Sequence, residues 1–129
     1  MRVNQYVGKT IDFYNIQYYN QGNTKYDTYE RLFLSSGGYF PGTSVNELIQ
    51  KGIHKEKIVI GKPVSKSDAS NTGTVDPRDL GDWVARAYKE IGWFSGVMFW
   101  QYISDLNGKA IEDAAGFLVT QCGKKNNCK

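Results

Sequence analysis

Hydrophobic and polar positions along the chain form three strand-like segments. Residues 11–19 are dense in aromatic and β-branched side chains and run into an Asn- and Gly-containing segment, which predicts a strand followed by a loop. Residues 57–63 have a continuous apolar centre and predict a buried strand, and residues 95–102 predict a third strand. Because a continuous apolar run lacks the alternation of a half-solvated sheet, we expect a parallel sheet.

Three helices are predicted between and after these strands. The first begins after Ser44, because Ser44 as N-cap and Glu47 three residues later fit a capping box. The second begins after Asp76 as N-cap, and its apolar residues recur at spacings of three and four until Gly92 ends it. Residues 110–120 predict a closing helix. The apolar stripe of the second helix consists of Leu80, Val84, Ala87, Tyr88 and Ile91.

The order of these elements, strand then helix three times, predicts an α/β fold with a parallel sheet. In such sheets the functional side chains collect beyond the carboxyl ends of the strands. The residues at those ends are Gln17, Tyr19, Asn20, Trp100 and Gln101. A parallel sheet needs cover on both faces and protection at its edges, and two or three helices do not supply it. We therefore expect the chain to be part of a larger fold.

Composition and charge remove several function classes. A chain of 129 residues with 40% hydrophobic and 22% charged residues is typical of one globular domain and not of a disordered or fibrous protein. The net charge of +3 comes from dispersed basic residues, which argues against a nucleic-acid partner. No apolar run approaches the roughly 20 residues of a membrane span. No Cys/His cluster with metal-ligand spacing occurs and one histidine cannot build one, so no metal or cofactor is expected.

The cysteines bear on the cellular compartment. Cys122 and Cys128 lie in a polar C-terminal tail, residues 121–129, and could close a small loop under oxidising conditions. This pair slightly favours secretion. Residues 1–6 are too polar for the core of a signal peptide, so no export signal is visible.

Three segments together resemble a known family: residues 16–20 (Ile-Gln-Tyr-Tyr-Asn), 57–63 and 96–100. In this order and spacing they resemble strands six, seven and eight of the family 18 glycoside hydrolases, the chitinases. The hevamine-like branch of plants and fungi, in which strand six ends in Gln-aromatic-Tyr-Asn, is the most similar. The resemblance covers residues 11–118 and implies a TIM (β/α)8 barrel. Residues 1–129 would then form its C-terminal portion, about strands six to eight with their helices.

The family's acid motif, D-x-x-D-x-D-x-E, does not occur in this sequence. The nearest run, residues 76–83, has the wrong spacing, lacks the glutamate and falls on a predicted helix. The family's third-strand S-x-G-G motif is also missing, because residues 35–38 (Ser-Ser-Gly-Gly) follow the sixth-strand match and are expected to be a loop. We therefore expect the isolated chain to be inactive. By resemblance, the protein is expected to be secreted.

The resemblance also implies roles for site residues. In the family a glutamic acid protonates the glycosidic oxygen while the substrate's own 2-acetamido carbonyl attacks the anomeric carbon, an exception to the two-carboxylate scheme. Tyr19 would donate a hydrogen bond to the acetamido oxygen, and Gln17 would bind the same group or its neighbours. Trp100 would stack on the sugar ring. The substrate-binding candidates are Asn20, Met98, Trp100 and Gln101.

These residues also have a structural interpretation. Tyr19 and Trp100 could be core aromatic residues. Gln17 favours a binding role more strongly, because an inward amide in a buried strand needs a partner. Tyr18 and Phe99 alternate with these residues and are expected to pack beneath the helices.

Three hypotheses follow from the sequence. The chain is part of a chitin hydrolase, or a non-catalytic protein that binds chitin or other N-acetylglucosamine oligosaccharides through its aromatic side chains. The third hypothesis is structural: a half-barrel has exposed sheet edges and is expected to self-associate or to pair with an N-terminal half.

Overall fold

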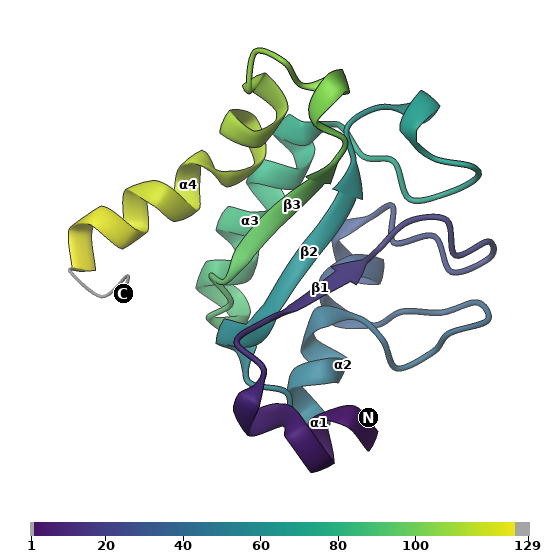
Figure 1. Ribbon diagram of the computed structural model, residues 1–129, viewed down its shortest axis with the longest axis vertical. Coiled ribbons are helices and arrows are strands. Elements are labelled where there is room, and N and C mark those ends of the chain that lie inside the picture. Colours follow the sequence, from purple (N-terminus) through teal and green to yellow (C-terminus); the bar gives the residue numbers. More distant parts are fainter. Residues whose placement is uncertain (1, 126–129) are drawn as a thin grey trace.

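The computed structural model of the chain describes residues 2–125, and the side chains of residues 2–121. Within this part of the chain, three strands form one sheet in the order β1-β2-β3. They are β1 (Tyr14–Gln17), β2 (Ile58–Pro63) and β3 (Gly96–Trp100). Both strand pairs are parallel, so the three arrows in Figure 1 point the same way. The expected α/β fold with a parallel sheet is confirmed.

Four helices accompany the sheet: α1 (Arg2–Val7), α2 (Val45–Gln50), α3 (Pro77–Ile91) and α4 (Lys109–Lys125). Figure 1 shows α3 behind the sheet, with α4 packed against α3 and β3. Among the described residues, no helix is both long and apolar enough to cross a bilayer. Shorter turns are the 3₁₀ helices Gly8–Thr10, Lys55–Lys57, Lys66–Asp68 and Tyr102–Ser104 and the π-helical turn Glu30–Leu34.

The predicted helix boundaries are confirmed where polar caps mark them. The hydroxyl of Ser44 accepts from the Glu47 N–H, and the Glu47 carboxylate accepts from the Ser44 N–H at 3.0 Å, which completes the capping box of α2. Helix α3 ends at Gly92, whose φ of +66° is the left-handed conformation that glycine adopts most easily.

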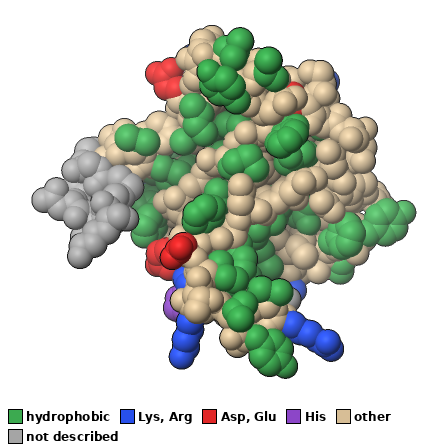
Figure 2. Space-filling model, viewed as in Figure 1, with side chains coloured by type: hydrophobic (Ala, Val, Ile, Leu, Met, Phe, Trp, Pro, Cys, Tyr) green, Lys and Arg blue, Asp and Glu red, His purple; other side chains and the backbone are tan. Residues whose placement is uncertain are grey.

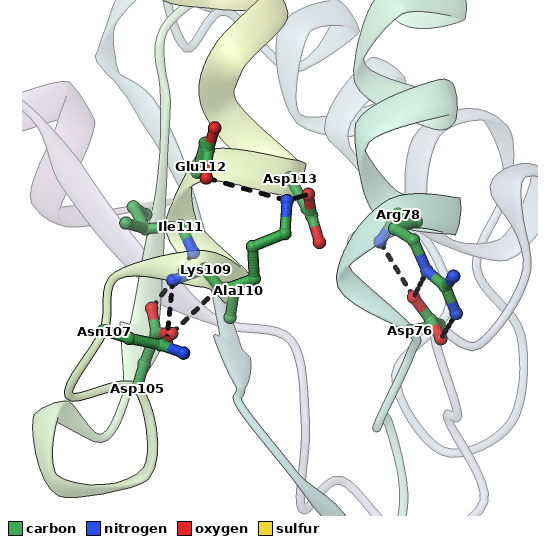
Figure 3. Close-up of polar contacts among 9 residues, drawn as sticks. All are labelled: Asp76, Arg78, Asp105, Asn107, Lys109, Ala110, Ile111, Glu112 and Asp113. Carbon is green, nitrogen blue, oxygen red and sulfur yellow. Dashed lines mark hydrogen bonds and ion pairs between the residues drawn. The ribbon is translucent and has the colours of Figure 1, made fainter.

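Two aspartates cap the longer helices, as Figure 3 shows. Asp76 accepts from the N–H of Arg78 at 2.9 Å at the start of α3. Asp105 accepts from the N–H groups of Ala110 and Ile111 at 2.8 and 3.1 Å at the start of α4. Each carboxylate satisfies N–H groups that have no partner inside the helix. Asp76 is therefore a cap residue, as expected from the sequence.

The first strand is shorter than expected. Residues 11–19 were expected to be extended, but β1 covers only the middle of this range, Tyr14–Gln17. The N–H of Tyr18 still donates to the carbonyl of Gly61 at 3.0 Å. Two residues later Asn20 has a φ of +58°, and the chain turns away from the sheet.

The other differences lie at the ends of elements. The strand expected over residues 95–102 stops at Trp100, because a 3₁₀ turn begins directly after Gln101. The helix expected over residues 110–120 continues to Lys125. Helix α1 was not predicted, since none of its residues is buried and no apolar spacing marks it.

The polar tail expected over residues 121–129 lies partly in α4. Residues 126–129 are outside the part of the chain that the structure describes. The side chain of Cys122 and the whole of Cys128 are also outside it, so their pairing stays a prediction.

The hydrophobic core lies on one face of the sheet only. Tyr18, Ile58 and Ile60 point toward the helices and are fully buried. Trp93 is buried beside them, and its indole N–H donates to the carbonyl of Ile58 at 2.9 Å. Phe99 packs against the same core, so both Tyr18 and Phe99 lie beneath the helices as expected. The fully buried remainder of this core is Leu32, Phe33, Val45, Leu80, Val84, Ala87 and Ala114.

Candidate functional site

On the face of the sheet that points away from the hydrophobic core, several expected site residues lie side by side on neighbouring strands. Gln17 lies beside Gly61, and Gly61 lies beside Met98, so these three form a row across the sheet. Trp100 lies beside Pro63, two positions further along β3 and so on the same face. Figure 2 shows this face, with hydrophobic side chains exposed across it and charged ones mainly at its rim. The structure thus brings Gln17, Met98 and Trp100 together at the carboxyl end of the sheet.

Gly61 makes the middle of this row flat. A Cβ atom at Gly61 would lie 2.9 Å from the carbonyl oxygen of Ile16 and 3.1 Å from the terminal methyl carbon of Met98. Both distances are shorter than ordinary van der Waals contacts. The Met98 side chain therefore covers the position that a larger residue at Gly61 would occupy, and it forms the floor of this part of the face.

Trp100 is half exposed, with 51% of its surface accessible, although it lies on a strand. A core role for Trp100 is therefore wrong for the chain as described. Its carbonyl accepts from the N–H of Val64 at 2.8 Å, and the peptide bond between Trp100 and Gln101 is cis. The indole is thus presented to solvent while its backbone is held by the segment that follows β2.

Tyr19 is only 6% exposed, and it is buried by a loop rather than by the apolar core. A Cβ atom at Gly73 would lie 2.6 Å from the Tyr19 Cα, so the loop after β2 presses directly onto it. Burial raises the pKa of the Tyr19 phenol, and the nearby Asp68 carboxylate raises it further. The phenol is therefore protonated at neutral pH and can donate a hydrogen bond.

Gln17 and Asn20 differ from expectation. Gln17 was expected to be an amide in a buried strand, but its side chain is exposed and its Nε2 donates to the carbonyl of Tyr19 at 3.3 Å. The reason is that, within residues 2–125, no helix lies over the sheet face that it occupies. The Asn20 Oδ1 accepts from the N–H groups of Ser70 and Asn71 at 2.7 and 3.1 Å. Asn20 therefore organises the loop after β2.

A carboxylate that sequence reasoning missed lies at the same end of the sheet. The Asp68 Oδ1 accepts from the Ser104 hydroxyl at 2.7 Å and from the Gln101 Nε2 at 3.4 Å. Its Oδ2 accepts from the hydroxyl and N–H of Ser65 at 2.7 and 3.0 Å. Hydrogen bonds from Ser65 and then Ser104 hold the pKa of Asp68 below its usual value. The spacing of Ser65 and Asp68, a capping box directly after a strand, is the signal that could have found it.

A buried lysine was missed as well. Lys62 is fully buried, and its Nζ donates to the carbonyls of Tyr18, Tyr26 and Gly73 at 3.0, 2.6 and 3.0 Å. Burial lowers the pKa of Lys62 to about 7. The amine joins the end of β1 to two loops, and so it supports the backbone on both sides of Tyr19.

The described side chains form no metal site. Among residues 2–121, no three His, Cys, Asp or Glu side chains are grouped so that they could hold a metal ion. His54 is exposed in the segment just before β2.

One solved structure similar to this chain is that of a fungal endo-beta-N-acetylglucosaminidase from glycosyl hydrolase family 18. The two share 20% sequence identity with a TM-score of 0.59, over 98% of this chain and 39% of that chain. The chain thus spans about two fifths of the length of the structure it matches. No protein-family description matches the sequence, and no curated protein does either. At the level of fold, the chain is an α/β protein whose three-stranded parallel sheet matches part of a family 18 TIM-barrel chain.

Proposed function

We propose that this chain forms part of a saccharide site that binds β-linked N-acetylglucosamine units, as in a chitinase of the hevamine-like branch. The observation that carries the proposal is the half-exposed Trp100, which shares an uncovered face with Gln17 and Met98 at the carboxyl ends of parallel strands. That end of an α/β sheet is where ligands bind. An exposed indole beside amide groups suits the apolar face and polar rim of a sugar ring.

The parent reaction would be hydrolysis of β-1,4-linked N-acetylglucosamine polymers by substrate-assisted, retaining catalysis. In that reaction positive charge develops on the acetamido group as its carbonyl oxygen attacks the anomeric carbon. The Tyr19 phenol, which is protonated at neutral pH, would donate to that group. Gln17 would orient the same group, and Trp100 would hold the ring.

The chain by itself is expected to bind and not to hydrolyse. The reaction needs a protonated carboxyl group at the glycosidic oxygen, and the family's acid motif does not occur in the sequence. Asp68 cannot take this role, because its hydrogen bonds lower its pKa and keep it ionised. Asp76 is bound to the first turn of α3.

Titration of chitotetraose by calorimetry tests the binding proposal. We expect the wild type to bind and Trp100→Ala to bind about five- to tenfold more weakly, the size of one aromatic stacking contact. Tyr6→Ala, which removes an aromatic side chain that is 84% exposed on α1, is the matched control and should bind like the wild type. Absence of binding, or equal binding by Trp100→Ala, contradicts the proposal.

A second candidate function is assembly. Within residues 2–125, β1 and β3 are each paired on one side only, and parallel sheets are normally covered on both faces. Beside β3, the side chains of Tyr102, Ile103 and Leu106 are 80, 69 and 66% exposed. We propose that these edges pair with a second copy or with a polypeptide that supplies further strands.

Light scattering across micromolar concentrations tests self-association. The wild type should form dimers or larger species, and Ile103→Lys should shift the equilibrium toward the monomer. A wild type that stays monomeric throughout contradicts self-association, and addition of a polypeptide carrying the remaining barrel strands then tests the other partner.

A further inference from the structure

The two oxygens of Asp68 have different partners. Oδ2 accepts only from Ser65, three residues earlier, in the capping box of the 3₁₀ helix Lys66–Asp68. Oδ1 accepts from Ser104 and Gln101, which are 36 and 33 residues away. A capping role accounts for the first oxygen and leaves the second unexplained. The contact of Oδ1 with Ser104 and Gln101, here called the interloop contact, joins the loop after β2 to the loop after β3.

The interloop contact lies directly beside the backbone of Trp100. Gln101 follows Trp100 in the chain, and the carbonyl of Gln101 accepts from the Ser104 N–H at 3.0 Å. The carbonyl of Trp100 itself accepts from the N–H of Val64, the residue directly before Ser65. The loop after β2 therefore holds the chain at Trp100 and again at the turn that follows it.

Packing alone does not fix the Trp100 ring, because half of its surface is in contact with solvent. An exposed side chain keeps more rotational freedom, and a ligand that immobilises it must overcome about 0.5–1.5 kcal/mol of lost entropy per side chain. Anchors at the Trp100 carbonyl and in the turn that follows hold the backbone that carries the ring before a ligand binds. Such preorganisation increases affinity without adding a contact.

We propose that Asp68 is a positioning residue for Trp100, and that its Oδ1 holds the loop after β3 so that the indole is preorganised to stack on a sugar ring. The inference rests on the proposed saccharide site. Asp68 suits this role because a charged acceptor forms stronger hydrogen bonds than a neutral one. An aspartate is ionised at neutral pH, and the hydrogen bonds from Ser65 and Ser104 lower the pKa of Asp68 further.

Two serine variants separate positioning from capping. Ser104→Ala removes a donor to Oδ1 and leaves the capping box complete, whereas Ser65→Ala removes the hydroxyl donor to Oδ2 and leaves the interloop contact. Ser104→Thr keeps a hydroxyl at the same position and serves as the conservative rescue. Asp68→Ala removes both roles. Each variant of the 129-residue chain is measured for its affinity for chitotetraose and for the NMR signal of the Trp100 indole N–H, assigned by its loss in Trp100→Phe.

We expect Ser104→Ala and Asp68→Ala to weaken chitotetraose binding about three- to tenfold and to shift or broaden the Trp100 indole signal. Ser104→Thr and Ser65→Ala should stay near the wild type, and the indole signal of the buried Trp93 should not move. An unchanged Trp100 signal in Ser104→Ala overturns the inference, and so do equal effects of Ser65→Ala and Ser104→Ala. If the wild type binds no chitotetraose, the proposed function fails, while the Trp100 signal without sugar still decides whether Asp68 positions the ring.

Discussion

Replacing Lys62 by methionine tests whether a buried amine holds the loops of the candidate site. Methionine has a similar length and fills most of the same space, but it donates no hydrogen bond. The substitution leaves the carbonyls of Tyr18, Tyr26 and Gly73 without the donor that they share. The perturbation is therefore mainly polar and not a cavity.

The expected change in the free energy of unfolding is the cost of the lost hydrogen bonds minus the relieved cost of burying the amine. A buried acceptor that loses its donor costs about 1–3 kcal/mol, and Lys62 serves three such carbonyls. Removing the amine also removes the cost of burying it, the same burial that lowers the pKa of Lys62 from 10.5 to about 7. Because the protonated amine has a carbonyl partner for each of its three N–H groups, we expect the lost hydrogen bonds to outweigh the relieved cost of burial. The expected loss in the free energy of unfolding is about 2–4 kcal/mol.

The effect should depend on pH. The amine of Lys62 has a pKa of about 7 in the folded chain against 10.5 as its ordinary value, so between these values the unfolded chain binds one more proton than the folded chain. The contribution of this group to stability therefore rises with pH across that window, by up to about 1.4 kcal/mol per unit. Lys62→Met lacks this contribution, so its deficit should be larger at pH 9 than at pH 7.

Urea unfolding of the 129-residue chain at both pH values measures the prediction. Lys89→Met, at an exposed position of α3, is the matched control and should unfold like the wild type. A deficit below about 0.5 kcal/mol for Lys62→Met would mean that the three carbonyls find other partners, and the reasoning about Lys62 would be wrong. An equal deficit at pH 7 and pH 9 would refute the lowered pKa.

Three further predictions concern other parts of the chain. Glu47→Gln should lower the melting temperature at pH 7. Hydrogen bonds from Ser36 and Ser44 to the carboxylate lower the pKa of Glu47 to about 2, so the difference from wild type should shrink as pH falls from about 4.5 toward 2, which thermal scans can follow. Gly92→Ala should destabilise the chain by about 1 kcal/mol in urea unfolding, because φ is +66° there, and a neutral result would show that α3 ends differently. Gly61→Ala should also lower the urea midpoint, since its Cβ would lie 2.9 Å from a carbonyl oxygen, and an unchanged midpoint would show that β1 and β2 can separate there.

The elements themselves could be predicted because their signals are local. The capping box of Ser44 and Glu47, the cap at Asp76 and the stop at Gly92 each depend on residues within a few positions of one another. The three strands were found from short apolar runs, and their parallel order followed from the helices between them. Alternation along β3 also placed Trp100 and Phe99 on opposite faces.

The burial and the contacts of the side chains on those faces depended on segments far away in the sequence. Gln17 was expected to be buried and is exposed, because no helix in residues 2–125 lies over its face of the sheet. In the sequence, Lys62 is a charged residue near the end of a predicted strand. Its three carbonyl partners are present only because two loops fold onto it.

The sequence by itself determined the kinds and order of the elements and the face on which each strand residue lies, since backbone periodicity and capping act over a few residues. Only the tertiary structure decided burial and partners. Asp68 and Ser104 are 36 residues apart, and no local pattern specifies that they meet. Hydrogen bonds between loops form where the ends of neighbouring strands bring those loops together, so the environment of Trp100 and Tyr19 follows from the packing of the whole sheet.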